Sequence, residues 1–158
     1  FSNYSNLPIW QKTAVENCLN SGFPMPNSKY FNSNGRAYPD ISMVGHRCPT
    51  IENGEIEGVD GTSCSSPLFA GVVSILNSHR IKNNKPTLGF FSPLLYKMFY
   101  ECENCFNDIT EGYNWCTEDR CCNNTEIQYG FQSTKGYDTV SGVGTPNIGN
   151  MIDYILGL

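Results

Sequence analysis

The strongest periodic pattern in the chain is an apolar stripe that follows a loop of small residues. Apolar side chains recur at i, i+1, i+4, i+5 and i+8, which is the spacing of one buried face of an α-helix. These positions are Leu68, Phe69, Val72, Val73 and Leu76. The pattern predicts a helix over about residues 63–81.

Shorter patterns predict three further helices. One is expected over residues 8–20, where a proline opens the pattern and a glycine lies just beyond it. Another is expected from Ser92 to Tyr100, with a proline at its second position. A final amphipathic helix is defined by Ile148, Met151, Ile152, Ile155 and Leu156.

Strand signals are fewer. Residues 40–44 are predicted to form a short strand, and residues 55–60 one arm of a hairpin that follows the Asn53-Gly54 turn. Residues 101–146 are rich in turns. Strands and helices alternate loosely, which is typical of part of an α/β sheet protein.

Composition restricts the class of protein. The 158 residues correspond to one domain, and with 39% hydrophobic and 16% charged residues the chain is not disordered. Its net charge of −5 argues against nucleic-acid binding, which uses a basic face. No run approaches the roughly 18 apolar residues of a membrane span. Sequons at Asn3 and Asn123 are compatible with glycosylation.

Ser63 is the first candidate for chemistry, because it stands where the long helix is predicted to begin. The first amide hydrogens of a helix have no partner within it, and the helix dipole favours negative charge there. Both an oxygen nucleophile and the anion formed after its attack are stabilised at such a place. The simpler interpretation is that Ser63 only caps the helix.

The residues around Ser63 favour the nucleophile. Gly61-Thr62-Ser63-Cys64-Ser65-Ser66-Pro67 resembles the nucleophile motif of the serine-carboxyl peptidases, the sedolisins, and residues 30–32 and 35–41 resemble the segment that precedes this motif in the tripeptidyl-peptidase branch. Other blocks continue the resemblance in the expected order along nearly the whole chain. They are residues 88–96, 106–110, 136–138 and 142–147.

This resemblance implies that residues 1–158 are the C-terminal part of one α/β catalytic domain with a subtilisin-like parallel sheet. In that family a glutamate base, an aspartate that orients it and an aspartate at the oxyanion all lie upstream of the serine. We therefore expect residues 1–158 alone to be inactive. The acidic residues near Ser63 match no catalytic position of the family and are interpreted as structural or solvated. They are Asp40, Glu52, Glu55, Glu57 and Asp60.

The activity implied is that of a serine peptidase of an acidic compartment, lysosomal or secreted, which releases tripeptides from the N-termini of peptides or proteins. A carboxylate base stays ionised in mild acid, where a histidine is already protonated. The upstream half of the domain, on the same or a separate chain, is the expected partner. The alternative is a non-catalytic fragment or pseudoenzyme, a calcium-bound module with disulfides.

The resemblance also implies one structural calcium ion, held by loops within about residues 106–146. Its ligands are the side chains of Asp108 and Asp138 and the carbonyls of Ile109, Thr134 and Gly136. Carboxylates and carbonyls are the hard oxygen ligands that calcium takes. Without the resemblance, two aspartates that cap turns would be the simpler interpretation.

Eight cysteines indicate an oxidising compartment. Cys102 and Cys105 with Cys121 and Cys122 could instead bind zinc, but adjacent thiolates such as the second pair rarely reach one tetrahedral ion. Disulfides are favoured, with their connectivity open. Cys64, which lies inside the predicted helix, is expected to be a small buried residue rather than part of a bridge.

Overall fold

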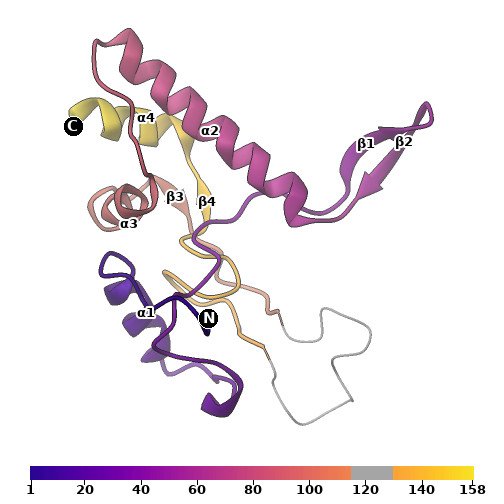
Figure 1. The fold of residues 1–158 in the computed structure, drawn as a ribbon, viewed down its shortest axis with the longest axis vertical. Coiled ribbons are helices and arrows are strands. Elements are labelled where there is room, and N and C mark those ends of the chain that lie inside the picture. The colour runs from indigo at the N-terminus through magenta and orange to yellow at the C-terminus, as the bar shows by residue number, and fades with distance from the viewer. Residues whose placement is uncertain (115–129) are drawn as a thin grey trace.

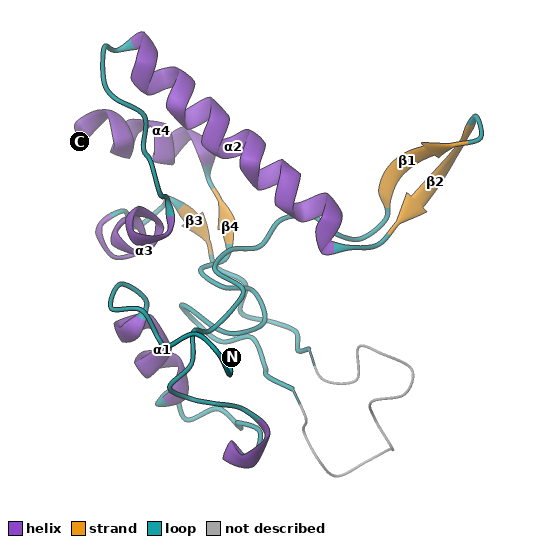
Figure 2. Ribbon diagram, viewed as in Figure 1, coloured by secondary structure: helices purple, strands orange, loops and turns teal. Residues whose placement is uncertain are grey.

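A computed structural model describes residues 1–114 and 130–158 (Figure 1). Its helices and strands are joined by long loops, which Figure 2 shows in teal. In chain order the elements are α1 (Lys12–Leu19), the 3-10 helix η1 (Ser28–Tyr30), β1 (Cys48–Glu52), β2 (Glu55–Val59), α2 (Thr62–Lys82), α3 (Ser92–Glu101), β3 (Phe106–Asn107), β4 (Thr145–Pro146) and α4 (Ile148–Gly157).

Helix α2 is the long helix that the apolar stripe predicts, and it extends one residue further at each end. Its buried side chains are Val72, Leu76 and Arg80, spaced four residues apart along one face. Leu68, expected on the buried face, is 45% exposed, and Ile75 is 44% exposed. The described residues therefore cover only part of the apolar surface of α2.

Two clusters of buried residues hold the described chain together. The first joins α1 to the 137–143 region, and the second lies between α2 and α4, which are neighbours in Figure 1. Helix α3 contributes to both, with Leu95 and Tyr96 in the first cluster and Met98 in the second. This shared helix makes the two clusters one connected core.

The strands form two antiparallel pairs, β1 with β2 and β3 with β4. The hairpin of β1 and β2 projects from the start of α2 (Figure 2), and Cys48 at its base lies opposite Val59. Its two turn residues, Asn53 and Gly54, have φ of 52° and 86°, as a tight hairpin turn of this type requires. The predicted hairpin arm is thus confirmed.

Two sequence-based predictions were wrong, the start of the first helix and the strand over residues 40–44. Helix α1 begins at Lys12 rather than at residue 8, because residues 8–11 form tighter turns in which the Gln11 amide donates to the carbonyl of Pro8 at 3.0 Å. Residues 40–44 form no strand. They make two backbone hydrogen bonds with residues 143–144, Val143 N–H to Asp40 and Ser42 N–H to Gly144, both 2.9 Å. Two bonds are too few for a regular ladder.

Candidate active site and calcium loops

Ser63 lies in the first turn of α2, exposed, after the N-cap residue Gly61. The Cys64 amide donates to the carbonyl of Gly61 at 3.0 Å, whereas no backbone acceptor in the described chain binds the amide of Ser63 itself. Pro67 lies four residues on and has no N–H to donate to the Ser63 carbonyl. The serine therefore combines an accessible hydroxyl with an available amide at the positive end of a helix dipole.

No acidic residue lies in the first turn of α2, and no carboxylate of residues 1–114 or 130–158 is hydrogen-bonded to the Ser63 hydroxyl. Asp60 lies near in sequence, but its Oδ1 accepts hydrogen bonds from the Arg47 amide at 2.7 Å and from Nδ1 of His46 at 2.9 Å. The backbone hydrogen bond, followed by the one from His46, lowers the pKa of Asp60. Asp60 therefore stabilises a loop and His46 is engaged away from Ser63.

Cys64 is not an isolated buried thiol, contrary to the sequence-based expectation. It forms a disulfide with Cys48, with the two Cα atoms 6.6 Å apart. The hairpin that begins at Cys48 returns the chain to the start of α2, so the pair meets across only 16 residues. The helical position of Cys64 gave no sign of this partner.

The other described cysteines support disulfides in place of zinc. Cys102 and Cys105 form a second bridge just after α3. Cys18 is a free thiol, and burial, with the nearby charge of Asp138, raises its pKa to about 11. Cys121 and Cys122 lie outside the described residues, as does the sequon at Asn123. Asn3, the other sequon, is exposed and thus compatible with glycosylation.

A cavity of about 300 Å³ opens beside the first two turns of α2. Thr62, Ser66 and Phe69 of α2 form one wall, and Phe91 with Leu95 of the α3 region forms another. Asp40 and the residues after it close a third side. Ser63 is not among the lining residues, so the cavity lies next to the serine rather than beneath it.

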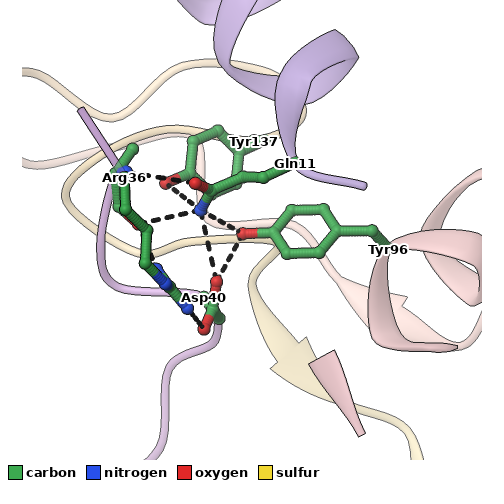
Figure 3. A network of polar contacts seen from close by, with 6 residues as sticks. Gln11, Arg36, Asp40, Tyr96 and Tyr137 are labelled. Atoms are coloured by element: carbon green, nitrogen blue, oxygen red, sulfur yellow. Dashed lines mark hydrogen bonds and ion pairs between the residues drawn. The ribbon is translucent and has the colours of Figure 1, made fainter. Parts of the chain in front are cut away.

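Asp40, which the sequence analysis interprets as structural or solvated, belongs to a network of polar side chains (Figure 3). Its Oδ1 accepts from Tyr96 at 2.6 Å and from Nε2 of Gln11 at 3.3 Å, and its Oδ2 pairs with Arg36. Burial raises the pKa of Tyr96 and of Tyr137, so both phenols remain neutral. Tyr96 donates to Asp40, whereas Tyr137 accepts from Nε2 of Gln11 at 3.5 Å. The oxygens of Asp40 are thus bound by Gln11 just before α1, by Tyr96 of α3 and by Arg36, so the carboxylate is not free to act as a base.

The structure brings the predicted calcium ligands together around one loop. The carboxylate of Asp108 accepts a hydrogen bond from the Gly136 amide at 2.8 Å, and that of Asp138 accepts from the Thr134 amide at 2.9 Å. Ile109 follows Asp108 directly in the chain. Gly136 has φ of 86°, a conformation that favours glycine, as the tight turn expected there requires.

The donor types of these residues, carboxylates and carbonyls, are those that calcium takes. Buried hydroxyls of Ser133, Thr134 and Thr139 have no hydrogen-bond partner among residues 1–114 and 130–158, which leaves polar atoms in this loop unsatisfied by the described chain. The described residues hold no cluster of three or more acidic, histidine or cysteine side chains. An ion here would therefore depend on two carboxylates, backbone carbonyls and water, a combination that calcium accepts. Asp138 is buried and its Oδ1 also accepts from the amides of Val140 and Ser141.

Comparison with known proteins finds several that are similar to this chain over nearly its whole length. No family model matches the chain. Physarolisin from Physarum polycephalum is 44% identical over 155 residues, which are 98% of this chain and 26% of that protein. Tripeptidyl-peptidase 1 from Mus musculus is 40% identical over 158 residues, 99% of this chain and 27% of that protein. The chain is homologous to the sedolisin-type peptidases.

The solved structure of Pseudomonas sedolisin, a serine-carboxyl proteinase complexed with two molecules of pseudo-iodotyrostatin, agrees. It has a TM-score of 0.70 and 26% identity, and the match covers 99% of this chain and 36% of that one. The α/β class and the correspondence to a C-terminal portion of a sedolisin domain are thereby confirmed. The chain spans about a quarter of the length of the curated relatives that it matches, 26% and 27% for the two named. In the part of the chain that the structure describes, no helix is long and apolar enough to cross a membrane.

Proposed function

We propose that this chain is the nucleophile-bearing part of a serine-carboxyl peptidase that releases tripeptides from the N-termini of peptides or proteins. The observation that carries the proposal is the placement of Ser63, exposed in the first turn of α2 with its amide available, in a chain homologous to sedolisins. The relatives named tripeptidyl-peptidase 1 support the tripeptide specificity.

In this proposal the Ser63 Oγ attacks the peptide carbonyl carbon and its proton passes to a carboxylate outside residues 1–158. The carbonyl oxygen becomes an anion, which the amide of Ser63 can stabilise together with the dipole of α2. Collapse of this intermediate expels the amine, which takes up a proton, and leaves an acyl-enzyme ester on Ser63. Water then hydrolyses the ester and restores the hydroxyl.

A carboxylate base suits an acidic compartment, because it stays ionised in mild acid. We therefore propose a lysosomal or secreted location, which the two disulfides also support. A calcium ion between Asp108 and the 134–138 loop would supply positive charge that holds the loop closed. The residues that would bind it are Asp108, Ile109, Thr134, Gly136 and Asp138.

The test is release of a tripeptide reporter by the full-length protein at about pH 4.5, where a glutamate base is ionised. Wild type is compared with Ser63→Ala and with Ser74→Ala, a matched control at an exposed serine on the same helix. We expect activity in wild type and Ser74→Ala, and its loss in Ser63→Ala. Removing an activated nucleophile costs several orders of magnitude in rate.

A non-catalytic, calcium-bound module is the second candidate. It is favoured by one observation, that no carboxylate of the described residues is hydrogen-bonded to the Ser63 hydroxyl. A folded, calcium-loaded full-length protein with no activity would overturn the peptidase and favour this module.

A further inference from the structure

The residues on both sides of Ser63 are fastened to one short stretch of chain, residues 43–48, which we call the anchoring segment. On the N-terminal side, the Gly61 amide donates to the Gly45 carbonyl at 2.8 Å. Asp60 accepts from the Arg47 amide at 2.7 Å. Both contacts precede Ser63 by no more than three residues.

On the C-terminal side, the next two residues are fastened to the same segment. Cys64 is bonded to Cys48 through the disulfide. The Ser65 hydroxyl donates to the Val44 carbonyl at 3.1 Å, with the Met43 carbonyl at 3.3 Å as a second acceptor. Ser63 thus lies between two residues tied before it and two tied after it.

The anchoring segment and the start of α2 approach so closely that the size of the side chain at position 45 is restricted. A Cβ on Gly45 would lie 2.6 Å from the Ser65 Oγ and 3.2 Å from the Gly61 carbonyl oxygen. Glycine at position 45 therefore permits the contact between the anchoring segment and the start of α2. The hydrogen bonds here are largely exposed, and Asp60 and His46 are 64% and 75% exposed, so these ties are individually weak. Among the described contacts between the anchoring segment and the start of α2, only the disulfide is covalent.

We infer that Cys48 and Cys64 are positioning residues for Ser63, in that their disulfide fixes the first turn of α2 in the orientation that catalysis needs. This inference rests on the proposed function. The first turn of a helix tends to fray, and no hydrogen bond of the described residues holds the Ser63 hydroxyl in place. A covalent tie one residue away restricts this motion. A displacement of about 1 Å at a reacting atom costs on the order of a hundredfold in rate, so the restriction has a catalytic consequence.

The test uses the full-length protein with Cys48 and Cys64 both changed to Ser, and a second variant with both changed to Ala. The matched control is Cys102→Ser with Cys105→Ser, which removes the other described disulfide, remote in sequence from Ser63. We expect kcat for the tripeptide reporter to fall by about tenfold or more in both test variants, with KM changed less than about twofold. Amide hydrogen exchange of residues 61–66 should accelerate in the test variants and not in the control.

An unchanged kcat in folded test variants would overturn the inference, as would an equal loss of kcat in the control. The two readouts separate this inference from the peptidase proposal. If the wild type has no activity that depends on Ser63, the proposed function and the catalytic part of the inference both fail. If wild type is active and exchange at residues 61–66 is the same with and without the disulfide, only the positioning role is overturned.

Discussion

The hydroxyl of Tyr96 donates a hydrogen bond of 2.6 Å to Oδ1 of Asp40. Tyr96 is 1% exposed, and it also accepts from Nε2 of Gln11 at 2.7 Å (Figure 3). The three residues come from α3, the 36–40 segment and the start of α1. This junction sets the position of the chain that continues from Asp40 into the anchoring segment at residue 43.

Tyr96→Phe should lower the free energy of unfolding of the full-length protein by about 1–3 kcal/mol, because the buried amide of Gln11 and the half-buried carboxylate of Asp40 each lose a partner. Chemical denaturation would measure the change. Tyr38→Phe is the matched control, since the Tyr38 hydroxyl donates to the Phe1 carbonyl at 3.2 Å but its side chain is 56% exposed. Equal effects of the two substitutions would contradict the importance assigned to burial.

Asp60 should titrate below its ordinary value of 3.8, because the Arg47 amide and then His46 stabilise its charged form. Since the folded pKa is depressed, the stabilisation is fully present above the unfolded value and is lost as the pH falls through the folded value. Carboxyl-carbon NMR titration would measure the midpoint. In His46→Ala we expect the midpoint to rise only part of the way, because the backbone hydrogen bond remains. An ordinary midpoint in the wild type would show that these contacts do not form.

Cys18 should resist alkylation in the folded protein. A rise in its pKa from 9.0 to about 11 leaves a thiolate fraction about a hundredfold smaller at pH 8, and burial further restricts access. Iodoacetamide labelling followed by mass spectrometry of the Cys18 peptide would measure the rate, with the unfolded protein as the reference. Equal labelling of the folded and unfolded protein would contradict the buried placement.

Calcium should raise the melting temperature of the full-length protein, and Asp108→Asn should reduce the calcium affinity by at least about tenfold. Asp108 is the better choice for substitution because Asp138 also accepts hydrogen bonds that hold the loop itself. Asp153→Asn, at an exposed position of α4, is the control. Calorimetric titration would give both affinities, and no loss in Asp108→Asn would exclude Asp108 as a ligand.

The sequence predicted those elements whose signals are local. Helix α2, the Asn53-Gly54 turn and the final helix each depend on periodicity or on turn residues within a short window, and each forms close to its expected bounds. The family resemblance also rests on short motifs, and the homologues confirm it.

What could not be predicted depends on contacts between segments distant in the sequence. Cys64 has helical neighbours on both sides, so the local pattern did not predict its disulfide. The bond to Cys48 depends on the hairpin, which returns the chain to the start of α2. Asp40 has the alternating neighbours of a strand, but its carboxylate is bound by Gln11 and Tyr96 from other parts of the chain. In both cases the local pattern predicts the secondary structure that the backbone prefers, but not the residue that the side chain contacts.

Arg80 connects the far end of α2 to the last helix of the chain. Its guanidinium donates to the Ile155 carbonyl at 2.7 Å and to the Pro86 carbonyl at 2.7 Å, and the residue is 8% exposed. Displacement of α4 from α2 would leave this buried cation without its Ile155 acceptor, at a considerable cost in free energy. Arg80 and Ser63 belong to the same helix, so this contact helps to fix the far end of the helix that carries the proposed nucleophile. One buried guanidinium therefore couples the placement of α2 to that of α4, and we expect a substitution at Arg80 to loosen both helices.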